Sequence, residues 1–324
     1  MHRAPFAATW VACCLTFVDV LGCSATQEPG EADAADDAQD AEAGPAEADA
    51  AAEPADSAAA MDAGATEEQP DASEPADSAV DAATPDASAA SDPCARPKPG
   101  PDSTGVRPGI TLAPSGSVTV KQAGKVVENL DIRGTITVLA NDVTIRNVRI
   151  TTGDYYPIRY FDNDNTGLVV EDSEIIGTSG NVTSAVAFAN YTARRLNIHG
   201  MADGLKADSN VLIEDCWIHD LSNGEQEHND GVQSTGGKGV TIRHNDISGA
   251  SNACVQAGDE GGATEDLTIE CNWLSGGGYT LNIRGKGATR PRNTRVINNR
   301  FGRDSGYGPW TFDDPSPTVR GNVY

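Results

Sequence analysis

Two short segments of the chain carry side chains that could exchange protons or bind a cation. Each contains an Asp-Gly pair followed by a polar side chain: Asp203 precedes Lys206, and Asp230 precedes Gln233. His228 stands just before the second pair. Two neighbouring carboxylates push each other's pKa values apart, an arrangement that general acid–base catalysis uses, and the same pair could bind calcium. Because Asp-Gly is also a common turn sequence, both aspartates could instead only fix turns.

Several other side chains could bind a sugar beside these segments. Arg159 and Arg284 could pair with the carboxylate of an acidic sugar. Gln233, Gln256 and Asn282 could hydrogen-bond sugar hydroxyl groups, or could simply continue an outward polar ladder. Aromatic rings that could stack on a sugar, or equally pack on the outside of the protein, belong to Tyr279, Trp217 and Trp273.

These side chains need a scaffold, and an eight-residue pattern that recurs about every 25 residues supplies one. In most copies positions 1, 3, 6 and 8 could point to one side, whereas positions 2, 4 and 7 are largely polar. Alternation on either side of a phase shift predicts two short strands joined by a bend. The copies are residues 143–150, 168–175, 191–198, 211–218, 240–247, 267–274, 294–301 and 317–324.

The sixth position of the pattern holds asparagine in the last four copies. An inward polar residue is tolerated if each amide bonds the equivalent amide one coil above and below. The sequence therefore predicts an asparagine ladder. Its members are Asn245, Asn272, Asn299 and Asn322.

A second column of short strands runs beside the first. Its apolar centres are Ile158, Val186, Leu205, Val232, Val255 and Leu281. We expect successive members to lie one coil apart, at about 4.8 Å. The residues that follow them should face outward, and they are Arg159, Ala187, Lys206, Gln233, Gln256 and Asn282. The two Asp-Gly segments should therefore stack on adjacent coils.

The repeat predicts an all-β protein. A β-propeller has a period of about 40 residues or more, and no segment shows a sustained helical period, so the pattern indicates a parallel β-helix of about 8–9 coils. The repeat resembles the right-handed parallel β-helix proteins of the pectin lyase-like superfamily over roughly residues 105–324. This superfamily contains lyases, hydrolases, adhesins and inert stalks, so the resemblance implies the fold and leaves the function open.

The catalytic motifs of that superfamily match only in part. Residues 229–231, Asn-Asp-Gly, resemble the Asn-Thr-Asp-Gly stretch of polygalacturonases, but Ala253-Cys254 replaces the paired aspartates expected one coil later. Residues 217–220 resemble the Trp-Ile-Asp-His stretch of pectate lyases with the last two residues exchanged. Residues 290–292, Arg-Pro-Arg, approach but do not match the arginine motif of the same lyases. These departures argue against assigning either activity from the motifs.

The remaining histidines and cysteines are expected to be mainly structural. His219 and His244 lie in the first strand column, away from the Asp-Gly segments. Cys216 falls at an inward position and is expected to be a buried free thiol, whereas Cys254 and Cys271 could form a disulfide. We find no Cys/His spacing that suggests zinc.

The N-terminus indicates export. Residues 1–22 have one firm positive charge, at Arg3, and a mostly apolar run that is too short to span a bilayer. The run ends in Val20-Leu21-Gly22-Cys23, which resembles the lipobox of bacterial lipoproteins. That resemblance implies lipid attachment at Cys23, and Ser24 after it favours the outer membrane or cell surface; a plain signal peptide is the alternative.

The acidity of the chain belongs to one segment. The formal net charge is −25, and residues 24–93 contain 20 acidic residues, 26 alanines and seven prolines without a Lys or Arg. Such a segment should be disordered and extended. We therefore expect a lipid-anchored linker over residues 23–93 and a β-helix domain over residues 94–324. This domain carries a net charge of only −5, which argues against a nucleic-acid partner.

The combined expectation is a monomeric surface lipoprotein that contacts the membrane only through its lipid. Its β-helix should bind an extracellular polysaccharide and cleave it by β-elimination. Lys206 or His228 would be the base, Asp203 and Asp230 an electrostatic or calcium-binding pair, and Arg284 a substrate clamp. Glycoside hydrolysis with Asp203 and Asp230 as acid and base is the enzyme alternative. A carbohydrate-binding or adhesive stalk is the alternative without catalysis.

Overall fold

Every copy of the eight-residue pattern bends at its fifth residue. The computed structural model describes residues 93–160, 165–179, 182–222 and 229–324, and in it each fifth residue has a left-handed φ. The φ values run from 48° at Asn147 to 67° at Gly321. This conformation reverses the alternation of side chains, which explains the phase shift in the sequence. The bend residues are Asn147, Asp172, Arg195, Asp215, His244, Cys271, Asn298 and Gly321.

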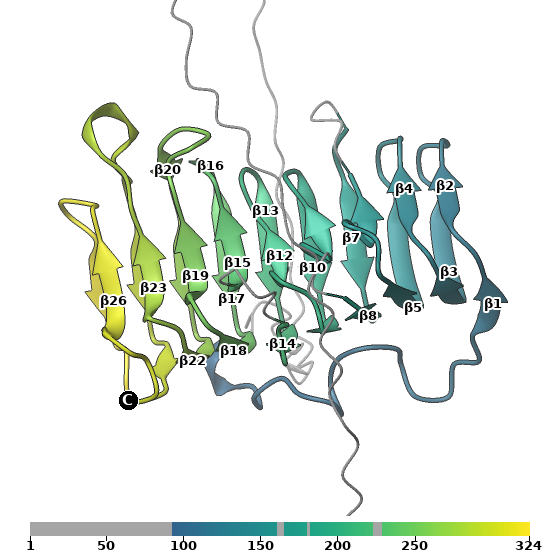
Figure 1. Ribbon diagram of the computed structural model, residues 1–324, viewed down its shortest axis with the longest axis horizontal. Coiled ribbons are helices and arrows are strands. Elements are labelled where there is room, and N and C mark those ends of the chain that lie inside the picture. The colour runs from purple at the N-terminus through teal and green to yellow at the C-terminus, as the bar shows by residue number, and fades with distance from the viewer. Residues whose placement is uncertain (1–92, 161–164, 180–181, 223–228) are drawn as a thin grey trace, which may run out of the picture. The chain divides into compact units, whose positions relative to one another are not determined.

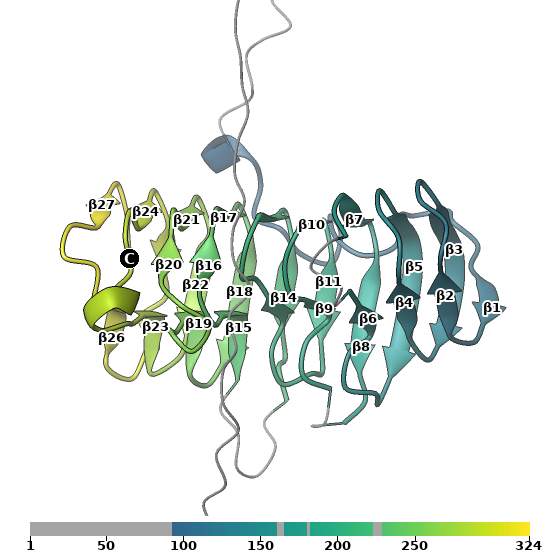
Figure 2. The same cartoon turned by 90° about the horizontal axis from the view of Figure 1, so that it is seen from above.

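The bend divides the large sheet of the protein into two arms, and all its strand pairs are parallel (Figures 1 and 2). The first arm contains β7 (Leu168–Glu171), β10 (Tyr191–Arg194), β13 (Val211–Glu214), β17 (Val240–Arg243), β21 (Thr268–Glu270), β24 (Arg295–Ile297) and β27 (Thr318–Arg320). The second contains β8 (Glu174–Gly177), β11 (Asn197–His199), β14 (Trp217–His219), β18 (Asp246–Ala250), β22 (Trp273–Gly276) and β25 (Arg300–Phe301). The long β5 (Thr144–Thr152) pairs with both arms and continues into β3 (Val126–Arg133) and β1 (Ala113–Ser115).

The predicted second strand column is also present. A four-stranded sheet contains β2 (Val118–Val120), β4 (Ile136–Val138), β6 (Ile158–Arg159) and β9 (Val186–Ala187). A five-stranded sheet continues the column with β12 (Leu205–Lys206), β15 (Asp230–Ser234), β19 (Ala253–Ala257), β23 (Tyr279–Ile283) and β26 (Gly308–Phe312). A small sheet joins β16 (Gly237–Lys238) to β20 (Thr264–Glu265), and two 3₁₀ turns lie at Pro93–Ala95 and Gly287–Thr289. The all-β parallel β-helix is therefore confirmed.

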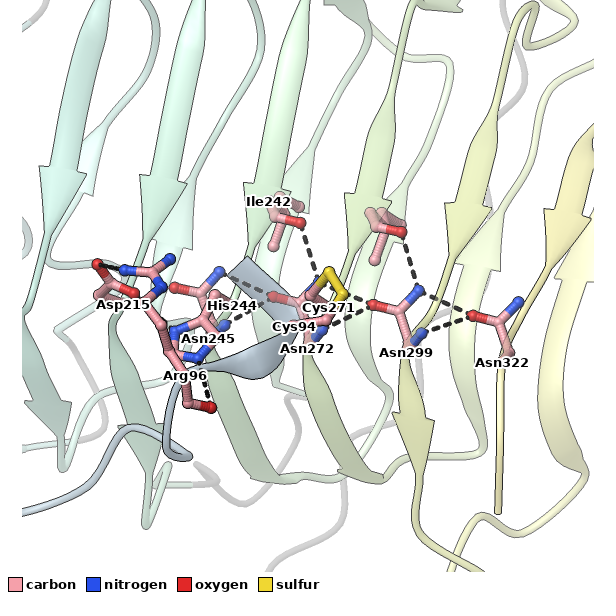
Figure 3. The surroundings of a disulfide bond; sticks show 11 residues. Cys94, Arg96, Asp215, Ile242, His244, Asn245, Cys271, Asn272, Asn299 and Asn322 are labelled. Carbon is pink, nitrogen blue, oxygen red and sulfur yellow. Dashed lines mark hydrogen bonds and ion pairs between the residues drawn. A yellow bond between two sulfur atoms is a disulfide. The ribbon is translucent and has the colours of Figure 1, made fainter. Parts of the chain in front are cut away.

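The asparagine ladder is confirmed as well (Figure 3). Nδ2 of Asn245 donates to Oδ1 of Asn272 at 3.0 Å, and Nδ2 of Asn272 donates to Oδ1 of Asn299 at 2.9 Å. The ladder ends at Asn322, whose Oδ1 accepts from Asn299 at 3.0 Å. Each rung also accepts a backbone N–H from the preceding coil, so the buried amides are fully engaged.

A segment before the first strand crosses the bends of several coils and is called the strap here (residues 94–107; Figures 1 and 3). A disulfide joins Cys94 to Cys271 at one bend. Nη1 of Arg96 lies 2.7 Å from Oδ2 of Asp215 at another bend. Further along, Arg107 pairs with Asp172 at 2.6 Å and Lys98 pairs with Asp246 at 2.9 Å. The strap is thus held across coils that are far apart in the sequence.

The expected pairing of Cys254 with Cys271 is wrong. Cys254 lies on β19, where its fully buried Sγ points inward and bonds the carbonyl of Ile247 at 3.4 Å. Cys271 occupies a bend residue and bonds Cys94 of the strap. The two sulfurs therefore lie on different sides of the coil wall. Cys216 is the buried free thiol that its inward position predicted, and burial raises its pKa to about 12.

Several expectations fall outside the described residues: the signal peptide, lipid attachment at Cys23, the linker before residue 93, and His228. Among the described residues, no helix has the length and apolar character needed to span a membrane.

Candidate functional site

The two Asp-Gly segments stack on adjacent coils, as predicted. Leu205 pairs with Val232, and Lys206 pairs with Gln233, in the parallel register of β12 and β15. Glycine is required after each aspartate. A Cβ at Gly204 would lie 2.6 Å from Cγ2 of Ile218, and one at Gly231 would lie 2.2 Å from Cγ2 of Ile247. A larger residue at either position would therefore push the chain away from the core.

Lys206 is the cation of the site. Its Nζ lies 2.6 Å from Oδ2 of Asp203 in the same coil and also donates to Oε1 of Gln233 in the next coil. Its side chain is only 11% exposed, so the ion pair is largely withdrawn from water. A shielded ion pair of this kind is held more rigidly than one on the open surface.

Asp230 is the titratable group whose surroundings are most unusual. It is 1% exposed. Burial, followed by the negative charge of Asp203, raises the pKa of Asp230 to about 7, although hydrogen bonds from Asn252 and Gln233 and the charge of Lys206 oppose the shift. A carboxyl group that exchanges its proton near neutral pH is suited to general acid–base chemistry.

Asn252 completes the surroundings of Asp230, and sequence reasoning missed it. Its Nδ2 donates to Oδ1 of Asp230 at 2.8 Å. Its backbone N–H donates to the carbonyl of Asn229 at 3.0 Å, and Oδ1 of Asn229 accepts from the N–H of Ser251 at 2.5 Å. Asp230 pairs in register with Ala253, so Asn252, the residue before Ala253, pairs with Asn229. Aligning the two coils in the sequence could therefore have placed Asn252 beside Asn229.

The two aspartates do not fit a calcium site, which the sequence left open. Oδ1 and Oδ2 of Asp203 accept from the N–H of Asp230 and from Lys206. The two oxygens of Asp230 accept from Asn252 and Gln233. Calcium needs several oxygen ligands turned toward one point, whereas these oxygens face hydrogen-bond donors. Within the described residues, no group of three or more His, Cys, Asp or Glu side chains could hold a metal ion.

The row of outward side chains continues from Gln233 to Gln256 and Asn282 as expected, but no hydrogen bond links these side chains among the described residues. Gln256 and Asn282 follow one coil after another. The carboxamide oxygens of both side chains are buried and accept no hydrogen bond from any described residue. Arg284 lies on the coil of Asn282, three coils from Lys206, and its Nε is 2.9 Å from Oδ2 of Asp313. The structure therefore does not bring Arg284 to the aspartates.

Arg159 lies on the other side of the site. Its neighbour in register is Ala187, and β9 of Ala187 contacts β12 of Lys206. Arg159 is therefore two coils from Lys206. The exposed guanidinium lines a hollow of about 420 Å³ together with Tyr155 and Tyr156. These tyrosines are a second feature that sequence reasoning missed, although adjacent aromatic residues are uncommon in a chain with 5% aromatic residues.

The remaining aromatic and histidine candidates lie elsewhere. Trp217 and Trp273 are on the second arm of the large sheet, where both pair with Asp246. The ring of Trp217 stacks on His219, with centroids 3.5 Å apart. His244 is buried at a bend, where its Nδ1 lies 2.6 Å from Oδ1 of Asp215. These placements agree with a structural or surface role for both histidines.

A larger hollow lies on the first arm and lacks suitable chemistry. It measures about 610 Å³ and is lined by strand residues such as Tyr191, Thr192 and Leu212. Arg243 is the one charged side chain among its lining residues. We therefore place the candidate site by its titratable groups, at Asp203, Lys206 and Asp230, which we call the carboxylate site.

Comparison with known proteins supports the architecture. A family model described as a right-handed beta helix region matches residues 104–272, which is just over half of the chain. The match covers the coils that carry Asp203, Lys206 and Asp230. Neither a curated protein nor a solved structure matches the chain.

Proposed function

The chain belongs to the right-handed β-helix family, a fold that suggests a carbohydrate-related or adhesive function, and we propose that its carboxylate site binds and cleaves an extracellular polysaccharide. The observation that carries this proposal is Asp230, whose buried carboxyl has a pKa of about 7. It lies beside a shielded Lys206–Asp203 ion pair on an outward row of polar side chains. A proton acceptor next to a cation suits β-elimination from a uronic acid.

The reaction assigns a separate role to each side chain. Ionised Asp230 takes the proton from the carbon next to the uronate carboxylate. The electron pair of that C–H bond forms a double bond to the adjacent ring carbon, whose bond to the glycosidic oxygen breaks. The leaving oxygen receives the proton from the carboxyl group that Asp230 has become. Lys206 neutralises the uronate as negative charge develops on it, and Asp203 positions Lys206.

The geometry favours Asp230 over Lys206 as the base. Lys206 donates to two acceptors and lies within an ion pair, so its nitrogen lone pair is not available. Among the described residues, Oδ2 of Asp230 accepts one hydrogen bond, from Nε2 of Gln233 at 3.2 Å. Gln233 is partly exposed and bonds Asp230, which is almost fully buried. We therefore propose that the substrate displaces Gln233 to reach Oδ2.

Hydrolysis is the second candidate, and the unequal aspartates favour it. Asp230 is protonated over part of the neutral range, whereas Asp203 is held in an ion pair, so the two carboxyls could serve as acid and base. Both candidates use the same side chains. The chemistry of the product distinguishes them, because only elimination creates a double bond.

A panel of polygalacturonate, alginate and hyaluronate tests the proposal with the full chain. We expect ultraviolet absorbance from unsaturated uronate ends with at least one polymer, and its loss in Asp230→Asn. Asp142→Asn is the matched control, because Asp142 is exposed and asparagine tolerates its left-handed φ of 56°. New reducing ends without absorbance would replace elimination by hydrolysis. Full activity in Asp230→Asn would remove Asp230 from the mechanism.

We also propose that the protein is exported and attached by lipid at Cys23 to the outer membrane or cell surface. The Cys94–Cys271 disulfide supports export, since structural disulfides form mainly in oxidising compartments. Labelling of growing bacteria with radioactive palmitate tests attachment: the wild-type chain should incorporate label, and Cys23→Ser should not. Equal labelling of both chains would contradict lipid attachment at Cys23.

A further inference from the structure

Two pairs of tyrosines flank the carboxylate site along one row of the β-helix. Tyr155 and Tyr156 form the first pair, with ring centroids 4.7 Å apart and planes at 89°. Tyr279 and Tyr307 form the second, with centroids 5.6 Å apart and planes at 49°. Tyr155 is 61% exposed and Tyr307 is 80% exposed. Exposed aromatic side chains that lie together commonly mark binding surfaces.

Backbone hydrogen bonds place the first pair in line with the aspartates. The N–H of Thr183 donates to the carbonyl of Tyr155 at 2.9 Å, and the N–H of Asp203 donates to the carbonyl of Thr183 at 2.6 Å. The negative charge of Asp203 also acts on the pKa of Tyr156. Burial, followed by Tyr155, raises the pKa of Tyr156, the charge of Asp203 adds to the shift, and Arg159 opposes it. The first pair therefore lies two coils from Asp203 in the same row.

The second pair continues the same row on the far side. Asn252 donates its N–H to the carbonyl of Asn229, and its own carbonyl accepts from the N–H of Gly278 at 2.8 Å. The carbonyl of Gly278 in turn accepts from the N–H of Tyr307 at 2.7 Å. Tyr279 and Asp230 each stand two residues before the inward residue of their strand, so they occupy equivalent positions on coils two apart.

Small residues, two of them buried alanines, lie between these groups along the row. Ala253 separates Asp230 from Tyr279, and Ala187 separates Arg159 from Lys206. The ring of Tyr307 packs closely on Gly278, where a Cβ would lie 3.2 Å from two of its ring atoms. From the coil of Arg159 to that of Tyr279 there are five coil spacings, or about 24 Å.

We propose that the two tyrosine pairs are sugar-binding subsites on either side of the carboxylate site. One glycan chain would lie along the axis of the β-helix, with sugar rings against Tyr155–Tyr156 and against Tyr279–Tyr307. Arg159 would pair with a carboxylate near the first pair. The bound glycan would then extend beyond the carboxylate site in both directions. The protein would therefore cut internal bonds of the polymer. The position of the bond to be cut rests on the proposed function, whereas binding at the tyrosine pairs does not.

Binding to the full-length Asp230→Asn protein tests the subsites without cleavage. The probes are oligogalacturonides, oligoalginates and oligohyaluronates of increasing, defined length, measured by titration calorimetry. We expect affinity to rise with length until one oligomer reaches both pairs. Added to Asp230→Asn, Tyr155→Ala and Tyr307→Ala should each lower the affinity for long oligomers about 3- to 10-fold, and their effects should multiply because the sites are far apart. Tyr155→Phe should retain binding, since it keeps the ring.

Tyr324→Ala is the matched control, because Tyr324 is 60% exposed but lies away from this row and should leave affinity unchanged. Unchanged affinity in both Tyr155→Ala and Tyr307→Ala would overturn the subsites, even if the wild-type protein cleaves a polymer. Tyrosine-dependent binding without cleavage by the wild type would overturn the proposed reaction and leave the subsites standing. Where cleavage occurs, early products of many lengths support internal cutting, and terminal fragments alone contradict it.

Discussion

The backbone N–H of Asp230 donates a hydrogen bond to Oδ1 of Asp203 at 2.8 Å. The two candidate carboxylates therefore belong to one hydrogen-bonded unit that spans two coils. Lys206 joins the same unit by bonding Asp203 and Gln233. Within it, in addition to burial, the charge of Asp203 raises the pKa of Asp230 and the charge of Lys206 lowers it, so substitutions can be tested by titration as well as by activity.

The substitution Asp203→Asn should lower the pKa of Asp230 below its value of about 7. Asparagine removes the negative charge that, after burial, contributes most to the upward shift. Burial remains, so the pKa should stay above that of an ordinary aspartate. Carbon-13 NMR titration of labelled aspartate carboxyls measures this change. Asp142→Asn is the control and should leave Asp230 unaffected; an unchanged or higher pKa in Asp203→Asn would contradict the coupling.

The raised pKa of Asp230 should make the free energy of unfolding depend on pH. The pKa of Asp230 is about 7 when folded and about 3.9 when unfolded, so the folded state binds the proton more tightly between these values. Its contribution to the free energy of unfolding is therefore fully present below about pH 4 and is lost as the pH rises to about 7. Asparagine does not titrate. The stability of Asp230→Asn relative to wild type should rise by a few kcal/mol from pH 4 to pH 8.

Urea unfolding at a series of pH values measures that difference. Comparing the two proteins at each pH cancels the titration of all other groups. A difference that is independent of pH would mean that the folded protein does not shift the pKa of Asp230. A difference that falls with pH would mean a shift in the opposite direction.

The coils were predictable from the sequence because each repeats the same alternation of buried and exposed residues around a left-handed bend. Asn147, Asp172 and Asn298 occupy left-handed bend positions that asparagine and aspartate tolerate, and apolar residues on both sides fix which face is buried. Asn245 and Asn272 were predictable as ladder rungs because an inward amide has few other partners. The register of Lys206 with Gln233 followed from counting coils.

The details of the site were less predictable, because they depend on contacts between coils of unequal length. Asn252 stands beside Asn229 on the next coil and reaches Asp230 diagonally, a contact that the repeat pattern does not specify. The disulfide partner of Cys271 was mistaken because nothing in the repeat indicates that the segment around Cys94 crosses the bends. Tyr155 lies outside the eight-residue pattern, so periodicity could not place it beside Arg159.

Removing an internal rung of the asparagine ladder should be strongly destabilising. In Asn272→Ala, the buried N–H of Asn245 loses its acceptor and the carbonyl of Ile242 loses a donor. Unsatisfied buried groups and the cavity together should cost about 3–5 kcal/mol. Asn322→Ala removes only the partly exposed end of the ladder and should cost about 1–2 kcal/mol. Equal losses in urea unfolding would contradict a cooperative buried ladder.

The strap should open when its disulfide is removed, while the coils beneath it remain folded. The Cys94–Cys271 bond closes a loop across 177 residues of sequence separation, and its loss in Cys94→Ser/Cys271→Ser should cost about 2–5 kcal/mol. Without it, the strap is held mainly by ion pairs such as Arg96–Asp215, in which Arg96 is 34% exposed and water weakens the attraction.

Hydrogen exchange should therefore become faster across residues 94–107 and stay slow at the buried Asn272. Arg96→Ala with the disulfide intact is the control and should change exchange in the strap much less. Slow exchange in the strap of the double variant would show that the ion pairs alone hold it. Equal loss of protection in the strap and in the coils would show that the strap does not open separately from the β-helix.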